Sequence, residues 1–579
     1  MTNAIESVPV LQSVLRRVME SAEFARLVAE VRGGARIVSV SGLTSGSARA
    51  LALAALQRAT GKRLAVVLEA NRDLESWEHD LRFWSDALRS ESGGERGEDE
   101  VLTLPASEGD PYAGASPHAE TLERRALTLW RLAQGRTRFV LLSARALVRK
   151  TIAPEQIRKA GAMLRRDEDF PPEKLVEQLL VTGYMREDPV GAIGEFSLRG
   201  GILDVWSPGH DAPVRVEFFG DTVDSIREFD PETQLSIAHL KEAEIVPMRE
   251  LAVGRDDFKL WAEAARERFH QERYARALRD RTVHADEGET FAGWEWLIPL
   301  VLNSESSIFD YLTDAVLVVD EPGGVEQYAS TMYENLAGRY AENETANEIG
   351  LRPDELYLTV EELRAKINEQ RRVEFRALGR AAAIVDERFV AEAEQPAVQI
   401  GRARAAASSP LFLFPAVESA PEVEWRSLPP RRYHGRIPDL AADVRGARQE
   451  KQSITLFAMP SPGVAERVGE VLADYGVDAR VALIGEGGSS EESAAVVTVG
   501  RLSGGFELPG AGLVVHVETD LFDEASAAAT ERRAPSEGKR EKGKGKSEAE
   551  TVLPYFCLFP FSLNYGQRGR MGGKGIWRS

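Results

Sequence analysis

Short runs of mainly apolar residues alternate with longer segments of helical periodicity over roughly the first 150 residues. The runs Arg36–Val40, Leu64–Leu68, Val101–Pro105 and Phe139–Ser143 are predicted strands, because apolar runs of this length suit strands that are buried on both faces. Residues before about Arg32 have the pattern of amphipathic helices. Strands that alternate with helices predict an α/β domain with a parallel sheet.

The pattern changes between Gly183 and Ser236, where four short strands follow one another with no helix between them. Glu195–Arg199 and Val214–Phe219 alternate polar and apolar residues, whereas Ile202–Trp206 and Val223–Phe229 are rich in β-branched and aromatic residues. The turns that separate them contain Gly200-Gly201, Ser207-Pro208-Gly209 and Gly220-Asp221. This order predicts an antiparallel meander of hairpins.

One face of this predicted sheet is charged. Side chains alternate across a strand, so Ser197 and Arg199 share a face with Glu195, and Arg215 shares a face with Glu217. Charged strand faces are common on sheets that water covers on one side, so the pattern alone fits either a solvated face or a binding face.

The rest of the chain has three further regions. Residues from about Gly323 to Ala405 are expected to be mainly helical. Beginning near Leu411, strand and helix patterns alternate again, which predicts a second, smaller α/β domain. From Glu524 the chain is dense in charge and poor in apolar residues, so we expect a disordered tail.

Composition limits the function. The chain has 579 residues and a net charge of −20, which argues against an extensive DNA-binding surface. Only weak, salt-sensitive DNA binding is expected, through the lysines between Lys539 and Lys546. The single cysteine, Cys557, excludes an internal disulfide and a cysteine zinc site. No signal peptide and no apolar run long enough for a membrane span can be found, so a cytoplasmic location is expected.

The first strand is followed by a loop in the position of a nucleotide-binding loop. Its residues Gly42, Gly46 and Ser47 depart from the G-x-x-x-x-G-K-[ST] pattern, because the second glycine comes one residue early and no lysine follows. Arg49 cannot be assumed to replace that lysine. The segment Val316–Glu321 ends in two carboxylates, as a magnesium-binding strand does, but without a phosphate loop a buried strand is the simpler interpretation. We therefore predict no catalytic residue, no cofactor and no metal ligand.

Two sequence segments resemble a known family closely. GEFSLRGGILDVW and PVRVEFFGDTVDSIREFDPETQ are similar to the UvrA-binding domain that bacterial transcription-repair coupling factors share with the excision-repair helicase UvrB. The resemblance implies that UvrA is the partner and that Arg186, Arg199, Arg215 and Glu217 bind it. UvrB has a further arginine at the position of Ser197, where coupling factors tend to have a small residue.

The resemblance extends over roughly residues 10 to 525, with further matches in FAGWEWLIPLVLNSESSIFDYLTDAVLVVDEP and RLSGGFELPGAGLVVHVETDLF. It implies a helicase-like parallel α/β domain with a degenerate phosphate loop, into which an antiparallel, β-rich UvrA-interaction domain is inserted. The division that we predict is 1–152 for the first part of the α/β domain, 153–253 for the inserted domain, 254–400 for the return and a helical connector, 401–525 for the small α/β domain, and 526–579 for the tail.

The implied function is recruitment of UvrA in transcription-coupled nucleotide excision repair. In the full-length family, domains that bind RNA polymerase and an ATP- and magnesium-dependent motor on double-stranded DNA follow, and this sequence lacks their motifs. The unusual last residues, from Val552, suggest a truncated or frameshifted gene end. Two alternatives remain. A UvrB-like helicase would need the missing lysine and an aromatic hairpin, but Tyr112 is the only aromatic residue between Asp110 and Arg125. The second alternative is a stand-alone UvrA-binding adaptor, which the sequence does not distinguish from a truncated gene product.

Overall fold

The computed structural model describes residues 10–88, 101–107, 109–302, 304–377, 411–415, 417, 419–451, 453–482 and 495–522. The chain separates into two compact units, Met1–Ala527 and Ala528–Ser579, and every described residue belongs to the first. The tail predicted at 526–579, with the lysines expected to touch DNA, therefore lies outside the described residues.

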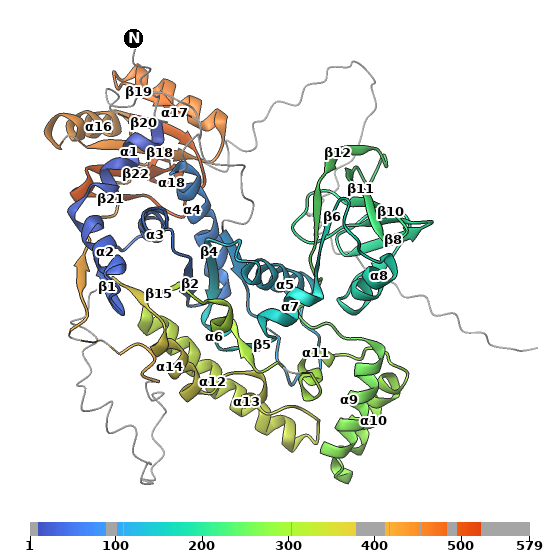
Figure 1. Cartoon of the computed structure of the whole chain (residues 1–579). Helices are drawn as coiled ribbons and strands as arrows, with labels where there is room; N and C mark the ends of the chain where they lie inside the picture. Colours follow the sequence, from blue (N-terminus) through green and yellow to red (C-terminus); the bar gives the residue numbers. More distant parts are fainter. Residues whose placement is uncertain are drawn as a thin grey trace, which may run out of the picture. The chain divides into compact units, whose positions relative to one another are not determined.

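Seven strands form a parallel sheet in the order β17-β1-β16-β15-β2-β4-β3. Figure 1 labels β1, β15, β2 and β4 among them. The bounds of the seven strands are β1 Ile37–Ser41, β2 Leu64–Leu68, β3 Val101–Leu104, β4 Phe139–Ser143, β15 Val316–Asp320, β16 Arg372–Arg376 and β17 Glu422–Glu424. Neighbouring residues of β2, such as Val66 and Val67, belong to two different cores because they point to opposite faces. The parallel α/β sheet predicted from the sequence is confirmed.

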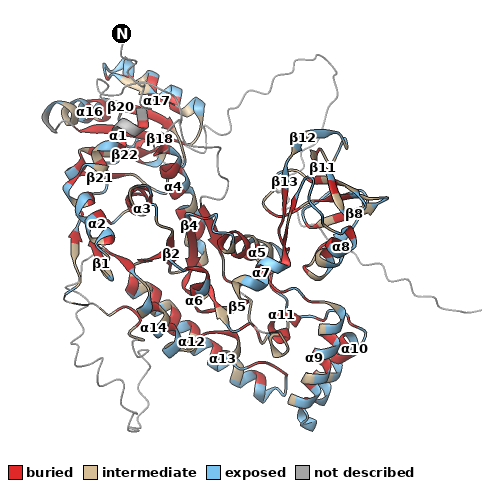
Figure 2. Ribbon diagram, viewed as in Figure 1, coloured by how far each residue is buried: buried red, intermediate tan, exposed pale blue. Residues whose placement is uncertain are grey.

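Helices cover both faces of this sheet, which explains why its strands are nearly continuous apolar runs. One core contains residues of the helices that precede β1 or follow β1 and β2, and the other contains residues of the later helices. Figure 2 shows β2 and β4 as buried, whereas α12 has both buried and exposed residues. The bounds are α1 Val10–Met19, α2 Ala22–Arg32, α3 Gly46–Thr60, α4 Leu74–Ala87, α5 Ala119–Ala133, α6 Ala144–Val148, α7 Pro154–Ala160 and α12 Pro322–Thr345.

A second sheet has six strands in the order β12-β11-β10-β9-β8-β7. They are β7 Met185–Arg186, β8 Glu195–Arg199, β9 Ile202–Val205, β10 Val214–Phe219, β11 Thr222–Phe229 and β12 Ser236–Leu240. All neighbours are antiparallel except β7 and β8, so the predicted meander is confirmed and gains one strand at each end. Gly200 and Gly201 form the turn between β8 and β9 with φ of 56° and 86°, which glycine adopts at little cost. The helix α8 (Pro172–Val181) packs into the core of this sheet through Leu175 and Leu179.

The six-stranded sheet is inserted into the first α/β domain. A two-stranded ladder of β6 (Ala162–Arg165) and β13 (Glu242–Ile245) joins the entering and leaving chain. The chain then forms α9 Arg255–Arg268, α10 Ala275–Asp286, α11 Trp294–Leu297, α13 Pro353–Leu356 and α14 Val360–Glu369. In the same return, β14 Ser306–Ser307 pairs with β5 Lys150–Thr151, which precedes the insert. Strands β15 and β16 lie between β1 and β2, so the returning chain completes the centre of the first sheet.

The mainly helical region expected from Gly323 to Ala405, of which 378–405 lies outside the described residues, contains a strand at the centre of the first sheet. This strand, β16, is polar in sequence, but Arg372, Glu374 and Arg376 are all buried. The two arginines bond the carboxylate between them, with Arg372 Nε 2.6 Å and Arg376 Nη2 2.7 Å from its two oxygens. Mutual pairing allows these charges to be buried. The alternation of RVEFR fits a strand, but it gives no sign that the charged face of that strand is buried.

A third sheet has five strands in the order β19-β20-β18-β22-β21, all parallel except β21. The elements are β18 Ile454–Met459, β19 Ala479–Val481, β20 Ala495–Val499, β21 Phe506–Leu508, β22 Leu513–Val517, α16 Ile437–Lys451, α17 Pro462–Asp474 and α18 Glu518–Leu521. This is the small α/β domain that the sequence predicts. Strand β17, although it lies within the predicted range 401–525, pairs with β1 and so adds an unforeseen edge strand to the first sheet.

Candidate functional site

The charged face of the six-stranded sheet brings Arg199, Arg215 and Glu217 together, whereas Arg186, at the sheet edge, pairs in register with the core residue Phe196. In the register of the strands, Ser197, Asp204, Arg215, Arg227 and His239 form one row across the sheet. The adjacent row contains Arg199, Ile202, Glu217 and Ser225. Arg199 and Arg215 therefore share a face, as the alternation of their strands predicts.

The buried carboxylate of Asp204 is the centre of this face. Its side chain is only 4% exposed, and it accepts two hydrogen bonds from Arg215, at 2.7 Å from Nε and 2.8 Å from Nη2. Arg215 also stacks over Phe229 at 4.5 Å and donates to Gln234 Oε1. The hydrogen bond to Asp204 raises the pKa of Arg215. Such a two-point pair fixes the orientation of the arginine side chain, so Arg215 stabilises the sheet through its bonds to the buried Asp204.

Arg199 and Arg186 are presented differently, because their guanidinium groups remain largely in solvent. The Arg199 side chain is 58% exposed, and its Nη2 lies 3.2 Å from Asp188 Oδ1 and 3.7 Å from Asp204 Oδ2. Arg186 is exposed and donates to the carbonyl oxygen of Leu198 at 3.3 Å. These two cations can still reach a carboxylate of another molecule.

Glu217 has its own partners on the same face. It accepts hydrogen bonds from Arg227 and from Ser225 Oγ, the latter at 2.8 Å. Sequence reasoning did not include Asp204 or Arg227. An aspartate within the otherwise apolar strand ILDV was the available signal for the first, and the alternation of β11 was the signal for the second.

Exposed apolar side chains also gather on this domain, which the sequence analysis did not foresee. Ile202 lies on the charged face between Arg199 and Glu217 in the register. Phe219, at the end of β10, is 84% exposed. Further large apolar side chains exposed in this domain are Leu180, Met185, Ile193, Leu235 and Ile237. Concentrations of exposed apolar residues are typical of binding surfaces.

At the position of the phosphate loop, charged side chains of the protein pair with one another. Arg49, in the first turn of α3, is buried, and its guanidinium pairs with Asp320 and with Glu321, the latter at 2.5 Å, while its Nε donates to the carbonyl of Leu43. These are the two carboxylates that end the strand resembling a magnesium-binding motif. Burial raises the pKa of Asp320 to about 6, against the opposing effect of Arg49.

One amide of the loop also has a protein partner. Thr44 N–H donates to Ser427 Oγ at 2.9 Å, and that hydroxyl donates to the carbonyl of Gly42 at 3.2 Å. A side chain at Gly42 would lie 2.9 Å from the carbonyl oxygen of Trp425. Gly46 and Ser47 begin α3, and the Ser47 hydroxyl accepts a hydrogen bond from the indole of Trp84. Over the described part of the chain, no group of three or more histidine, cysteine or carboxylate side chains could hold a metal ion.

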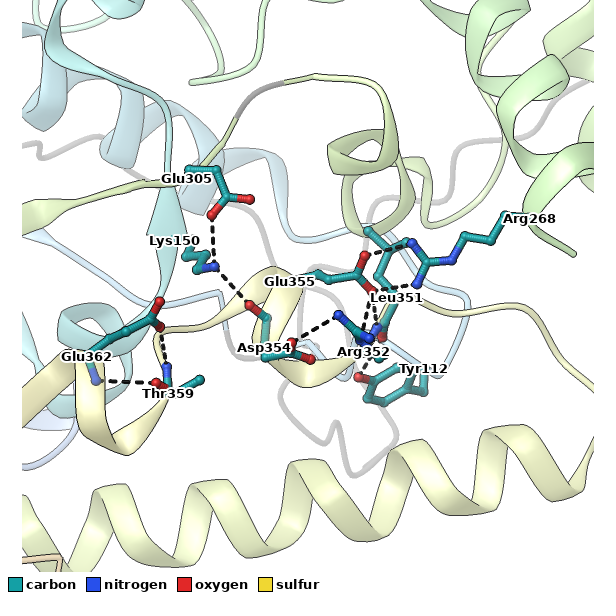
Figure 3. Close-up of polar contacts among 10 residues, drawn as sticks. All are labelled: Tyr112, Lys150, Arg268, Glu305, Leu351, Arg352, Asp354, Glu355, Thr359 and Glu362. Carbon is teal, nitrogen blue, oxygen red and sulfur yellow. Dashed lines mark hydrogen bonds and ion pairs between the residues drawn. The ribbon is translucent and has the colours of Figure 1, made fainter. Parts of the chain in front are cut away.

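Tyr112, the aromatic residue in the segment where UvrB has its hairpin, packs against the protein (Figure 3). Its hydroxyl donates to the carbonyl of Leu351 at 2.9 Å, and its ring lies 5.6 Å from that of Tyr340. The segment that receives it is held by a two-point ion pair between Arg268 and Glu355, at 2.6 and 2.7 Å. Tyr112 therefore has a structural role, and its ring is not presented for stacking on a base.

Comparison with known proteins gives a consistent relationship. Residues 163–251 match the family described as the UvrB interaction domain. The chain is 35% identical over 370 residues to the transcription-repair-coupling factor of Myxococcus xanthus, covering 61% of this chain and 29% of that protein. It is 26% identical over 525 residues to that of Bacillus subtilis, covering 87% of this chain and 40% of that protein. The factor of Mycobacterium tuberculosis is 27% identical over 516 residues, with 87% and 38% covered.

These matches confirm the resemblance predicted from the sequence, and the chain spans well under half the length of these relatives. No helix within the described residues is long and apolar enough to cross a membrane.

Proposed function

We propose that this relative of the transcription-repair coupling factors binds UvrA through the charged face of its UvrB interaction domain, and so serves transcription-coupled nucleotide excision repair. The observation that carries the proposal is the exposed guanidinium of Arg199 on that face. Arg186 is exposed beside the same strand. Two exposed apolar residues adjoin these arginines, Ile202 as the register partner of Arg199 and Met185 as the residue before Arg186. A surface with both features suits a protein partner that offers carboxylates.

The internal pairs give the face a fixed shape. The pair of Asp204 with Arg215 and the pair of Glu217 with Arg227 connect β9, β10 and β11 across the sheet. Arg199 projects beside this framework, so little of its surroundings must reorganise when a carboxylate of UvrA approaches. Arginine suits this role because its planar fork matches a carboxylate, which a lysine does not reproduce.

We propose no enzymatic activity and no cofactor for this chain of 579 residues. Binding of RNA polymerase and ATP-driven movement on double-stranded DNA are proposed for the parts of full-length relatives that lie beyond this similarity. The adaptor interpretation shares the same UvrA-binding face. The UvrB-like helicase interpretation is disfavoured by the inward position of Tyr112 and by the ion pairs of Arg49.

Titration of UvrA with Arg199→Ala tests this function. Truncation of a charge that is paired and desolvated at an interface costs about 2–5 kcal/mol, so binding should weaken at least tens-fold. Arg186→Ala should act in the same direction. Arg276→Ala is the matched control, because Arg276 is 88% exposed on α10, outside the sheet. The parent melting temperature should be kept in all three variants. Unchanged UvrA affinity in both sheet variants would show that the face is only solvated surface.

A further inference from the structure

A cavity of about 910 Å³ opens at the amino-terminal edge of the first sheet. It is lined by residues that directly precede strands, such as Arg63 before β2 and Arg138 before β4. The phosphate loop follows the carboxyl end of β1, so this cavity lies at the opposite edge of the sheet. Its volume is within the range of ligand cavities, which is about 300–1,000 Å³.

Positive charge is concentrated in this cavity, although the chain as a whole has a net charge of −20. Four separate segments contribute to its lining. The cationic side chains are Lys62, Arg63, Arg136, Arg138 and Arg158, and the carboxylates are Glu155, Asp310 and Asp314. A local excess of cations within a concave site focuses the field on a small anion more strongly than the same charges on a flat surface.

Two of these cations, Lys62 and Arg63, form no ion pair within about 4 Å of a described carboxylate. Arg63 donates to the backbone carbonyls of Thr137, at 3.1 Å, and Tyr311, at 3.4 Å, but neither Arg63 nor Lys62 forms an ion pair with any described residue. Burial lowers the pKa of Arg63, which reflects the cost of keeping this charge partly out of water. The two side chains are neighbours in sequence and line one cavity, so they can act on one anion.

The carboxylates of the cavity are mostly engaged. Glu155 lies 3.5 Å from Arg158, and Asp310 lies 3.6 Å from Lys366. Asp314 is the exception, and it interacts electrostatically with Arg63. Carboxylates in the lining would repel a long polyanion that crosses the cavity, whereas a compact anion can lie against the cations alone.

We propose that this cavity binds a compact phosphate-bearing ligand, with Arg63 and Lys62 as its principal contacts and Asp314 as a carboxylate that weakens the binding. Arg136, Arg138 and Arg158 supply additional positive charge around the cavity. The site is separate from the UvrA-binding face and from the degenerate phosphate loop.

Calorimetric titration of the chain with inorganic pyrophosphate tests the proposal. Loss of a charge-assisted hydrogen bond costs about 1.5–3 kcal/mol, so Arg63→Ala should weaken binding by about tenfold or more. Lys62→Ala should weaken it as well, and it loses no ion pair among the described residues. Arg276→Ala, far from the cavity in sequence and highly exposed, should leave the affinity unchanged.

Asp314→Asn gives a readout that loss of folding cannot imitate, because it should tighten pyrophosphate binding. Asparagine tolerates the backbone of Asp314, whose φ is 66°. Absence of pyrophosphate binding at millimolar concentration overturns the proposal, as does binding that Lys62→Ala and Asp314→Asn leave unchanged. A short single-stranded oligonucleotide that binds more tightly than pyrophosphate, and depends on Lys62 and Arg63, would instead identify a nucleic-acid surface and overturn the choice of a compact ligand.

Discussion

Arg49 forms an ion pair with Asp320 across 271 residues of sequence, and its guanidinium bonds the adjacent Glu321 as well. In a nucleotide-binding α/β domain, a lysine near this loop would meet phosphate, and carboxylates at this strand end would hold magnesium. Here the cation and the carboxylates neutralise each other. The contact gives each of these charged groups a protein partner within the folded sheet.

We expect no magnesium-dependent hydrolysis of ATP, because the loop amide of Thr44 and the guanidinium of Arg49 already have protein partners. The measurement is phosphate release, with calorimetry beside it. Micromolar ATP binding that Arg49→Ala abolishes and Lys62→Ala leaves intact would contradict the prediction, since it would locate the nucleotide at this loop.

Removal of the Arg49 side chain should destabilise the first α/β domain. Arg49→Ala leaves Asp320, whose side chain is only 18% exposed, without its counterion. Breaking a buried pair typically costs about 3–5 kcal/mol, and we expect a loss near the lower end of that range because Asp320 is partly in water. Chemical denaturation measures the loss. Arg72→Ala is a suitable control, because Arg72 is 76% exposed near the same sheet and its pairs with Glu69 and Asp73 are at the surface, so the change should stay below about 1 kcal/mol. Equal effects of the two substitutions would refute a structural role for Arg49.

The arginines on the charged face of the six-stranded sheet should separate into two kinds. Arg215→Ala removes the partner of the buried Asp204 and should lower the stability of the inserted domain by about 3–5 kcal/mol. Arg199→Ala should leave the melting temperature nearly unchanged, since its pairs are longer and its side chain is largely in water. Melting curves measured with UvrA titrations distinguish the two. A parental melting temperature for Arg215→Ala would show that its bonds to Asp204 contribute little.

Much of the fold follows from sequence patterns. The strands Leu64–Leu68 and Phe139–Ser143 are predicted to the residue, because strands buried on both faces form apolar runs. The meander is predicted because its polar and apolar residues alternate. Strand β16 is not predicted because its charged residues suggest an exposed segment, whereas in the fold they are buried and pair with one another. Strand β17 is not predicted because Glu422–Glu424 is short and polar.

The site was predictable to a smaller extent. The pattern places Arg199 and Arg215 on one face, but it cannot show that Asp204 holds one of them and leaves the other in solvent. The role of Arg49 also depends on a partner 271 residues away, whose position only the folded sheet determines. Local periodicity contains no information about such distant pairing.

His516 should make the stability of the small α/β domain depend on pH. Its ring, on β22, is buried between Phe457 and Tyr433, and burial lowers its pKa to about 4, with Asp443 opposing the shift. The folded pKa is therefore below the unfolded value, so the unfolded state takes up a proton first. The stability contribution is complete above about pH 6.5 and is lost as the pH falls towards 4.

The loss should reach at most about 3 kcal/mol over that interval, from roughly 1.4 kcal/mol per unit of pKa. His516→Phe keeps an aromatic ring beside Phe457 and removes the titrating group. Urea denaturation of both proteins between pH 7 and pH 4 measures the difference, and the variant should lose less stability than the parent over this range. Buried carboxylates such as Asp80, whose pKa is raised to about 6, titrate in both proteins and cancel in the comparison. Parallel stability profiles for the two proteins would mean that His516 is not the group responsible.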